Sequence, residues 1–125
     1  MLTVMKFGGS SVADLAHIRN VAQRCIEKQQ SGSQVVVVLS AMGKTTDGQI
    51  ATAKQITEKP SRREMDMLLA TGEQVSVSLM AITMFQMGVS AVSLNACQVP
   101  MHTTSDYQNA RFKRMRSVSI RLKRA

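Results

Sequence analysis

The chain has 125 residues, of which 44% are hydrophobic, so it is long enough for one domain with a core and too apolar for a disordered chain. Its net charge of +8 comes from its C-terminal end: seven Lys and Arg residues lie within 111–124, whereas residues 1–110 hold nine basic and eight acidic side chains. This distribution disfavours nucleic acid as a partner of the body, and the sequence shows neither a signal peptide nor an apolar run long enough to span a membrane.

The first predicted element is a buried strand over residues 2–7, followed at once by a glycine turn. Lys6 lies near the end of the strand, Gly8 and Gly9 allow a close approach of backbone to a ligand, and the two serines that follow are candidate helix N-caps. A strand, a glycine turn, a helix N-terminus and a nearby cation favour phosphate binding. The alternative is a tight strand–helix turn whose lysine merely reaches solvent, and these residues alone leave both interpretations open.

A helix and a second strand are predicted next. Apolar residues recur at helical spacing up to about residue 30, at Leu15, Ile18, Val21, Ala22, Cys25 and Ile26. Residues 35–39 contain four consecutive valines, which is typical of a strand covered on both faces in a parallel sheet. The three elements form a βαβ unit. Because Cys25 lies on the apolar helix face, we expect it and Cys97 to be reduced, buried thiols of a cytoplasmic protein.

The loop over residues 40–46 follows the carboxyl end of the second strand. In open α/β sheets ligands bind at the carboxyl ends of strands, so we expect this loop to neighbour the first glycine turn. Its Gly-Lys-Thr sequence resembles the end of a Walker motif, but Val38 stands where that motif needs glycine, which excludes a P-loop. A second helix is predicted over about residues 47–58, capped by Thr46 or Asp47.

The longest predicted helix begins with a capping box at residues 61–64 and ends at Gly88. Gly72 lies inside this helix, where glycine costs about 1 kcal/mol relative to alanine, so some group must approach closely there. Glu73, beside it, is either a solvated neighbour of a packing glycine or a functional carboxylate. The predicted apolar stripe consists of Met65, Leu68, Leu69, Gly72, Val75, Leu79 and Ile82.

The remaining residues predict a third apolar strand over 89–94 and a polar loop over 95–106. His102, in this loop, is expected to be a solvated histidine. No metal ligand is expected, because neither histidine has the spaced partners of a metal site. From Asn109 onward basic and apolar residues alternate, a pattern that fits either a helix or a strand.

Five motifs occur in a family-like order: KFGGSS at 6–11, SAMG at 40–43, TTD at 45–47, REMDMLL at 63–69 and TGEQ at 71–74. Together they resemble the N-terminal part of aspartate kinase, a member of the amino-acid kinase family. The resemblance implies an α/β fold, namely an incomplete three-layer α-β-α sandwich of the carbamate kinase-like type with a mainly parallel sheet. We expect residues 1–112 to form this part of the domain and residues 113–125 to be an aberrant or disordered basic tail.

The resemblance also implies a reaction, the transfer of a phosphoryl group from ATP to the side-chain carboxylate of L-aspartate. The product is 4-phospho-L-aspartate, the entry compound for lysine, threonine and methionine, and Mg²⁺ is held mainly through the nucleotide. Lys6 is the implied catalytic residue, against the transferring phosphoryl group. The implied phosphate-binding residues are Lys6, Gly8, Gly9 and Ser10, and the implied aspartate-binding residues are Ser40, Thr46 and Glu73. A role in holding the substrate ammonium favours the functional interpretation of Glu73, since a buried carboxylate without a partner is costly.

Aspartate kinases have a longer catalytic domain followed by regulatory domains, so we expect these 125 residues alone to have little or no kinase activity. Homo-oligomers are compatible with the family, and neither the oligomeric state nor the regulation of this chain can be read from the sequence. One alternative is another amino-acid kinase, acting on glutamate, carbamate or a nucleotide, although the TTD and TGEQ motifs favour aspartate. Others are a non-catalytic fragment that binds an acidic partner through its basic tail, and a piece of a larger assembly.

Overall fold

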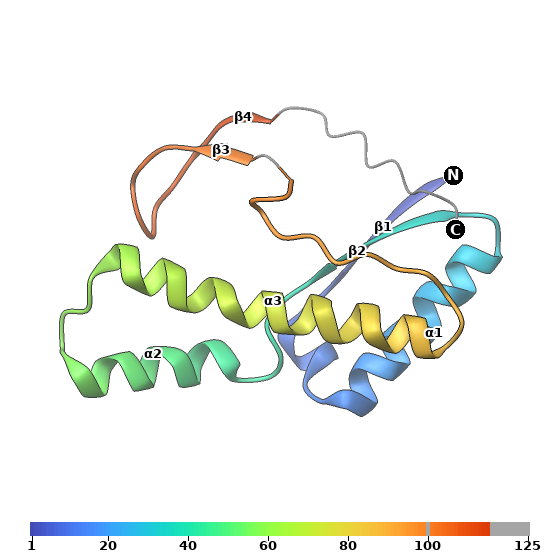
Figure 1. The fold of residues 1–125 in the computed structure, drawn as a ribbon, viewed down its shortest axis with the longest axis horizontal. Coiled ribbons are helices and arrows are strands. Elements are labelled where there is room, and N and C mark those ends of the chain that lie inside the picture. Colours follow the sequence, from blue (N-terminus) through green and yellow to red (C-terminus); the bar gives the residue numbers. More distant parts are fainter. Residues whose placement is uncertain (100, 116–125) are drawn as a thin grey trace.

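Two parallel strands form the centre of the computed structural model, which describes residues 1–99 and 101–115 (Figure 1). Strand β1 (Leu2–Phe7) pairs with β2 (Gln34–Leu39) along their whole lengths. Helix α1 (Leu15–Gln30) connects them, which confirms the predicted βαβ unit. The other elements are the 3₁₀ turn η1 (Gly9–Val12), α2 (Thr45–Ile56), α3 (Arg62–Gln86), β3 (Met101–Thr103) and β4 (Phe112–Met115).

The sheet of β1 and β2 is covered on one face by the described residues. Successive side chains of a strand point to opposite faces, and Met5, Phe7, Val35 and Val37 all pack against the core cluster formed with α1 and α3. On the opposite face Val4, Val36 and Val38 are 40–63% exposed. The expectation of a strand covered on both faces is therefore wrong within residues 1–99 and 101–115, because both helices lie on the same side of the sheet.

The core lies between α1, α3 and the covered face of the sheet. Its buried members are Val12, Ile18, Val21, Ala22, Cys25, Ile26, Leu39, Met80 and Met84. On α3 the buried line is Met65, Gly72, Ser76, Met80 and Met84, so the predicted stripe is only partly correct. Val75 and Ile82 are 52% and 64% exposed, because the helix packs on the core through the face that carries the small residues Gly72 and Ser76. Ser76 is fully buried, and its hydroxyl donates to the Glu73 carbonyl oxygen at 3.0 Å.

Helix α3 is long and apolar enough to pass a length-and-hydropathy test for a membrane span, with a mean hydropathy of 1.3 over 18 residues. The sequence alone did not suggest this, because Glu73 and several Ser and Thr residues interrupt the apolar run. Core helices of soluble proteins pass the same test. In this fold α3 packs against α1, α2 and β2, although only 22% of the tested window is buried among the described residues.

The predicted third strand is not formed. Residues 89–94 run extended past the sheet, with Val89 and Ala91 packed against the core, but they belong to no sheet among the described residues. Half-buried and exposed side chains alternate in this segment as they do in a strand. Its backbone, however, makes no strand-to-strand hydrogen bonds with the described residues. Further along the chain β3 and β4 pair antiparallel as a hairpin, which identifies residues 112–115 as strand. Residues 116–125 of the predicted tail lie outside the described residues, so the division at residue 112 stays a prediction.

The two cysteines differ in their environments. Cys25 is a free, buried thiol, as predicted, and the desolvation that accompanies its burial raises its pKa. Cys97 is free but exposed, so the prediction that it is buried is wrong. The error arises because residues 95–98 form a turn at the surface, held by hydrogen bonds from the Cys97 and Gln98 amides to the Asn95 side chain.

Helix α1 begins later than predicted. Residues 9–12 form the 3₁₀ turn, and Asp14, not Ser10 or Ser11, caps α1 by accepting the backbone N–H of His17 at 2.9 Å. Two other helix starts also differ from the prediction. Helix α2 begins at Thr45 with Lys44 as its cap, in place of Thr46 or Asp47. Ser61 is the N-cap residue of α3, as predicted, but its side chain makes no capping bond and Glu64 pairs instead with Arg63.

The Asp14 cap predicts an acid-sensitive α1. The hydrogen bond from the His17 backbone, followed by that from its ring, lowers the pKa of Asp14 below its ordinary value of 3.8. A lowered pKa in the folded state contributes stability above the unfolded pKa, and this stability is lost as the pH falls through the folded pKa. We expect Asp14→Asn, which keeps an acceptor but does not titrate, to unfold at a lower urea concentration than the unaltered chain at about pH 6, and we expect this difference to shrink as the pH falls towards about 3. Equal differences at both pH values would contradict this.

Candidate active site

The loops after β1 and β2 lie against each other at the carboxyl ends of the two strands. The Gly43 amide donates to the Gly9 carbonyl oxygen at 3.0 Å, and the Ser40 amide donates to the Phe7 carbonyl oxygen at 3.1 Å. This confirms that the loop over residues 40–46 neighbours the first glycine turn. The two loops therefore form one backbone surface at the edge where parallel sheets bind ligands.

The two glycines of the first turn have different environments. A Cβ on Gly9 would lie 2.8 Å from the Ala41 carbonyl oxygen and 3.1 Å from that of Gly43, so any side chain there would separate the loops. A Cβ on Gly8 would meet nothing within 4 Å. Gly9 is thus needed for packing within the protein, whereas the open side of Gly8 leaves room for a ligand.

Helix α3 meets the same loop from the other side. A Cβ on Gly72 would lie 2.8 Å from the Ala41 Cβ and 3.6 Å from Thr45 Cγ2. The Gln49 side-chain amide donates to Thr71 Oγ1 at 2.8 Å, which ties α2 to α3 beside this contact. The helix glycine is therefore explained by close packing. Glu73 is exposed, so the expectation of a buried carboxylate is wrong.

The predicted site residues lie on the four segments that meet around Ala41. Lys6 is exposed and points away from the core, since its neighbours in β1, Met5 and Phe7, pack inward. Ser10 is exposed and lies in η1, directly after Gly9 and before the start of α1. Ser40 and Thr46 are half-buried, in the loop after β2 and in the first turn of α2, and Glu73 directly follows the packed glycine of α3.

Electrostatics at this edge differ from the sequence prediction. The N-terminus of α1 is occupied by the Asp14 carboxylate, so its dipole does not serve the glycine turn. Within the turn, the first N–H groups of a 3₁₀ helix, here those of Gly9 and Ser10, have no partner inside the helix. Helix α2 begins beside Ala41 without a side-chain cap, so its positive end faces this region.

Three positioning residues were missed by sequence reasoning, namely Ala41, Gln49 and Thr71. Each acts through a contact between distant segments, and no local pattern distinguishes them from ordinary small or polar residues. Gln49 illustrates this: its amide group donates to Thr71, while its Oε1 atom is buried without a hydrogen-bond partner in the described part of the chain. Only the approach of α2 to α3 gives these side chains a role.

Comparisons with known proteins agree on a family. The sequence model of the "Amino acid kinase family" matches residues 1–119. Aspartokinase of Geobacillus stearothermophilus is 50% identical over 120 residues, which are 96% of this chain and 30% of that protein. Aspartokinase 2 of Bacillus subtilis (strain 168) is 51% identical over 110 residues, 88% of this chain and 27% of that protein. The chain thus spans about three tenths of the length of these curated relatives.

A solved structure gives the same result for the fold. The crystal structure of aspartate kinase from Synechocystis matches with a TM-score of 0.77 and 49% sequence identity, over 79% of this chain and 17% of that chain. The resemblance read from the KFGGSS, SAMG, TTD, REMDMLL and TGEQ motifs is therefore confirmed, and so is the α/β class with a parallel sheet.

The packing at Ala41 predicts opposite effects for two helix glycines. Gly72→Ala should lower the free energy of unfolding by roughly 1–2 kcal/mol, because overpacking against the Ala41 Cβ outweighs the better helix propensity. Gly48→Ala is the matched control: it lies in α2 with nothing within 4 Å of a Cβ, and should raise that free energy by about 0.5–1 kcal/mol. Urea unfolding followed by circular dichroism measures both, and stabilisation by both variants would refute the close contact.

Proposed function

The chain belongs to the amino acid kinase family, and from that membership we propose that it forms the N-terminal part of an aspartate kinase. The proposed reaction transfers the γ-phosphoryl group of ATP to the side-chain carboxylate of L-aspartate and gives 4-phospho-L-aspartate. The observation that carries the proposal is the meeting of the KFGGSS, SAMG, TTD and TGEQ segments around Ala41. About 50% identity to aspartokinases supports the choice of aspartate over other acceptors.

We propose that the phosphate side of the site consists of Lys6 and the glycine turn. The exposed Lys6 ammonium would lie against the transferring phosphoryl group and offset its charge. Gly8 would let the β- and γ-phosphates approach the backbone, and the N–H groups of Gly9 and Ser10 would donate to their oxygens. A cation and unpaired backbone donors are the groups that a phosphate requires, so the residues present fit this ligand.

The acceptor side in this proposal consists of Ser40, Thr46 and Glu73. The Ser40 and Thr46 hydroxyls would donate to aspartate oxygens, and the positive end of α2 would favour the acceptor carboxylate. The exposed Glu73 carboxylate would hold the substrate ammonium. Because Gly72 fixes α3 against the SAMG loop, the position of Glu73 relative to Ser40 and Thr46 would also be fixed.

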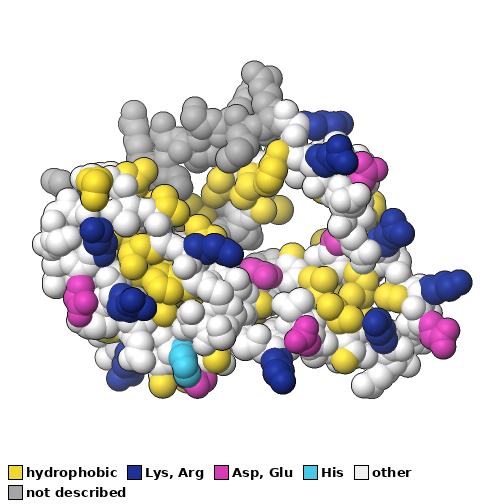
Figure 2. All heavy atoms as spheres, turned by 180° about the vertical axis from the view of Figure 1, so that it is seen from behind, with side chains coloured by type: hydrophobic (Ala, Val, Ile, Leu, Met, Phe, Trp, Pro, Cys, Tyr) yellow, Lys and Arg dark blue, Asp and Glu magenta, His cyan; other side chains and the backbone are white. Residues whose placement is uncertain are grey.

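The proposed cofactor is Mg²⁺, which would enter with ATP and be held mainly by the nucleotide phosphates. Among residues 1–99 and 101–115, no three His, Cys, Asp or Glu side chains are grouped so as to hold a metal ion. We also propose a cytoplasmic location and a place in the biosynthesis of lysine, threonine and methionine. Charged side chains are scattered over the face shown in Figure 2, and neither nucleic acid nor a membrane is a proposed partner.

The acceptor assignment predicts a weak aspartate site. L-Aspartate titrated into the ¹⁵N-labelled chain should shift the amide signals of Ser40, Thr46 and Glu73. Glu73→Gln should weaken this binding roughly two- to fivefold, since exposed ion pairs contribute about 0.2–1 kcal/mol. Glu64→Gln, two and a half turns earlier on the same helix, is the matched control and should leave the affinity unchanged. Equal affinity in both variants, or stronger binding of L-glutamate than of L-aspartate, would contradict the assignment.

The whole reaction needs more than the groups described here, so the 125 residues alone should be nearly inactive. Incubation with ATP, Mg²⁺, L-aspartate and hydroxylamine should form no more aspartyl-hydroxamate than a control without ATP. A full-length aspartokinase serves as the positive control. Robust ATP-dependent hydroxamate formation would show that these residues suffice.

A further inference from the structure

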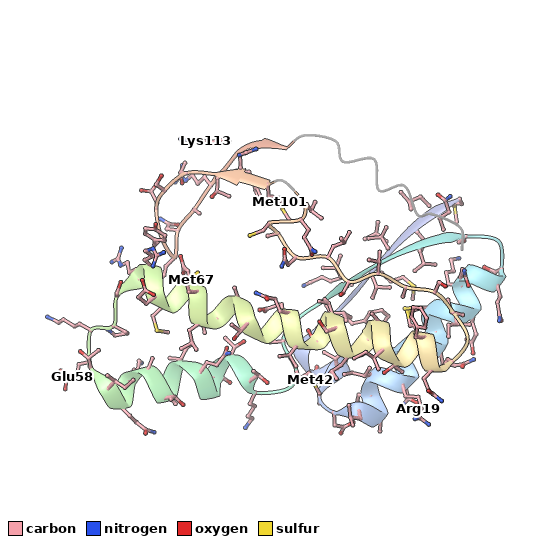
Figure 3. All side chains as sticks on the ribbon, in the orientation of Figure 1. Arg19, Met42, Glu58, Met67, Met101 and Lys113 are labelled. Carbon is pink, nitrogen blue, oxygen red and sulfur yellow. The ribbon has the colours of Figure 1, made fainter. Side chains whose placement is uncertain are left out.

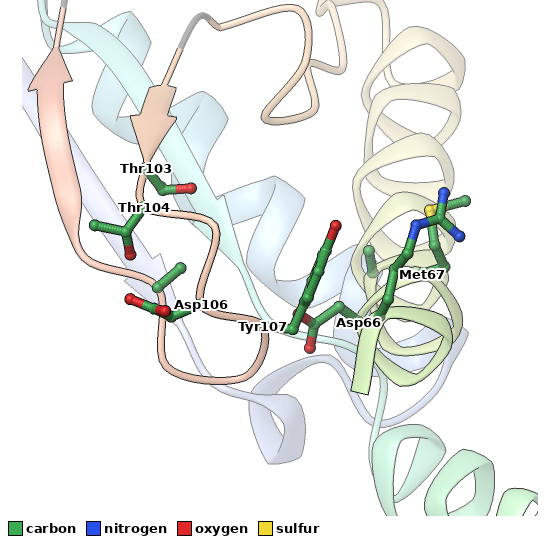
Figure 4. Close-up of a pocket in the computed structure, with 9 residues that line it drawn as sticks. Asp66, Met67, Thr103, Thr104, Asp106 and Tyr107 are labelled. Carbon is green, nitrogen blue, oxygen red and sulfur yellow. The ribbon is translucent and has the colours of Figure 1, made fainter. Parts of the chain in front are cut away.

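The hairpin of β3 and β4 lies against the first half of α3 and encloses a groove of about 360 Å³ (Figure 4). Arg63, Asp66, Met67 and Ala70 of α3 line one wall, and Thr104, Asp106 and Tyr107 of the hairpin line much of the other. The neighbouring Glu64 carboxylate, and to a lesser extent Tyr107, raise the pKa of Arg63. This groove is not part of the site described above.

Asp66 makes the hydrogen bond that joins the two walls. Its Oδ2 atom accepts the backbone N–H of Gln108 at 3.0 Å, across 42 positions of sequence. Gln108 has a φ of +64° and is the one non-glycine residue with positive φ in the described ranges. An L-residue adopts this conformation at a cost, so a specific partner is needed to keep it there. The Asp66 carboxylate is that partner.

Hydrogen bonds within the hairpin connect its turn to its two strands. The Thr104 amide donates to the Arg111 carbonyl oxygen at 2.9 Å, and the Arg111 amide donates to Thr104 Oγ1 at 3.0 Å. The Asn109 amide closes the turn by donating to the Asp106 carbonyl oxygen at 3.0 Å. The hydrogen bond between Asp66 and the Gln108 amide at the tip therefore positions the whole turn.

Asp66 also lies on the same face of α3 as Glu73. Residues seven apart are two helical turns apart on one stripe, and Ala70, which lines the groove, lies between them. One end of the groove is therefore within a turn of Glu73. A hairpin held at Asp66 forms a wall along the helix face that carries the proposed ammonium-binding carboxylate.

We propose that Asp66 is a positioning residue that holds the β3–β4 hairpin on α3 and thereby walls the aspartate side of the active site. This proposal rests on the proposed function for its substrate, but the attachment itself does not. Asp66 touches no substrate here and acts through the Gln108 amide. Its oxygen acceptor, not its charge, is what the hairpin requires.

Tyr107 provides a direct readout, because the chain has one tyrosine and no tryptophan. It is 47% exposed in the docked hairpin, so release should raise acrylamide quenching of its fluorescence about twofold. We expect this rise in Asp66→Ala but not in Asp66→Asn, whose amide oxygen still accepts the Gln108 N–H. Glu58→Ala is the control, since Glu58 lies after α2 in the connection to α3 and does not line the groove (Figure 3).

The same variants should differ in their affinity for L-aspartate. By NMR titration, Asp66→Ala should weaken L-aspartate binding at least about threefold, while Asp66→Asn and Glu58→Ala bind as the unaltered chain does. Unchanged quenching in Asp66→Ala would overturn the attachment, and so would a rise in Asp66→Asn as large as that in Asp66→Ala. A rise in quenching without loss of aspartate affinity would overturn the substrate-side role.

Two further results distinguish a failure of the Asp66 attachment from a failure of the proposed function. If Asp66→Ala does not fold, hydrogen exchange of the Gln108 amide in the unaltered chain decides: protection supports the bond to Asp66, and exchange at the rate of an unfolded chain overturns it. If the unaltered chain binds no L-aspartate, the proposed function and the substrate-side role both fail. The quenching experiment still tests whether Asp66 holds the hairpin on α3.

Discussion

The contact of Ala41 with two glycines is the constraint on which the candidate site depends. Gly9 brings the turn after β1 against the Ala41 carbonyl oxygen, and Gly72 brings α3 against the Ala41 Cβ. Each approach would place an added Cβ 2.8 Å from its neighbour, closer than nonbonded carbon and oxygen atoms are found. A residue between two backbones this close cannot be much larger or move far, so three segments distant in sequence share one fixed point.

This fixed point explains why a helix former as poor as glycine occurs in the middle of a 25-residue helix. The propensity cost of about 1 kcal/mol is offset by packing that larger residues would prevent. The gain is positional: Glu73 follows Gly72, Ser40 precedes Ala41, and the backbone proposed to bind phosphate follows Gly8. The exposed Glu73 and the half-buried Ser40 are thus positioned through the backbone that carries them. Preorganisation of this kind is what a phosphoryl transfer mainly asks of a protein.

Sequence reasoning succeeded where the determining interactions are local. Strands β1 and β2, helix α3 and the meeting of the two glycine loops follow from apolar runs, glycine positions and the rule for parallel sheets. It failed where a distant partner decides. Residues 89–94 have the burial pattern of a strand but no neighbour to pair with among the described residues. The capping box at residues 61–64 failed for a local reason instead, because Glu64 pairs with the adjacent Arg63. For Glu73 the sequence leaves two interpretations open, a solvated neighbour of a packing glycine and a functional carboxylate on a buried side; in the structure Gly72 serves packing and the Glu73 carboxylate is exposed.

The open face of the sheet supports the family assignment independently of the motifs. Val36 and Val38 are apolar, yet 40% and 44% exposed, and Val4 in the neighbouring strand is 63% exposed. Burying such side chains is worth about 1.5–3 kcal/mol each, so four consecutive valines are hard to explain in a two-layer fold. A three-layer α-β-α sandwich places helices on both faces of its sheet and uses every valine of β2. The described residues supply one of these helical layers.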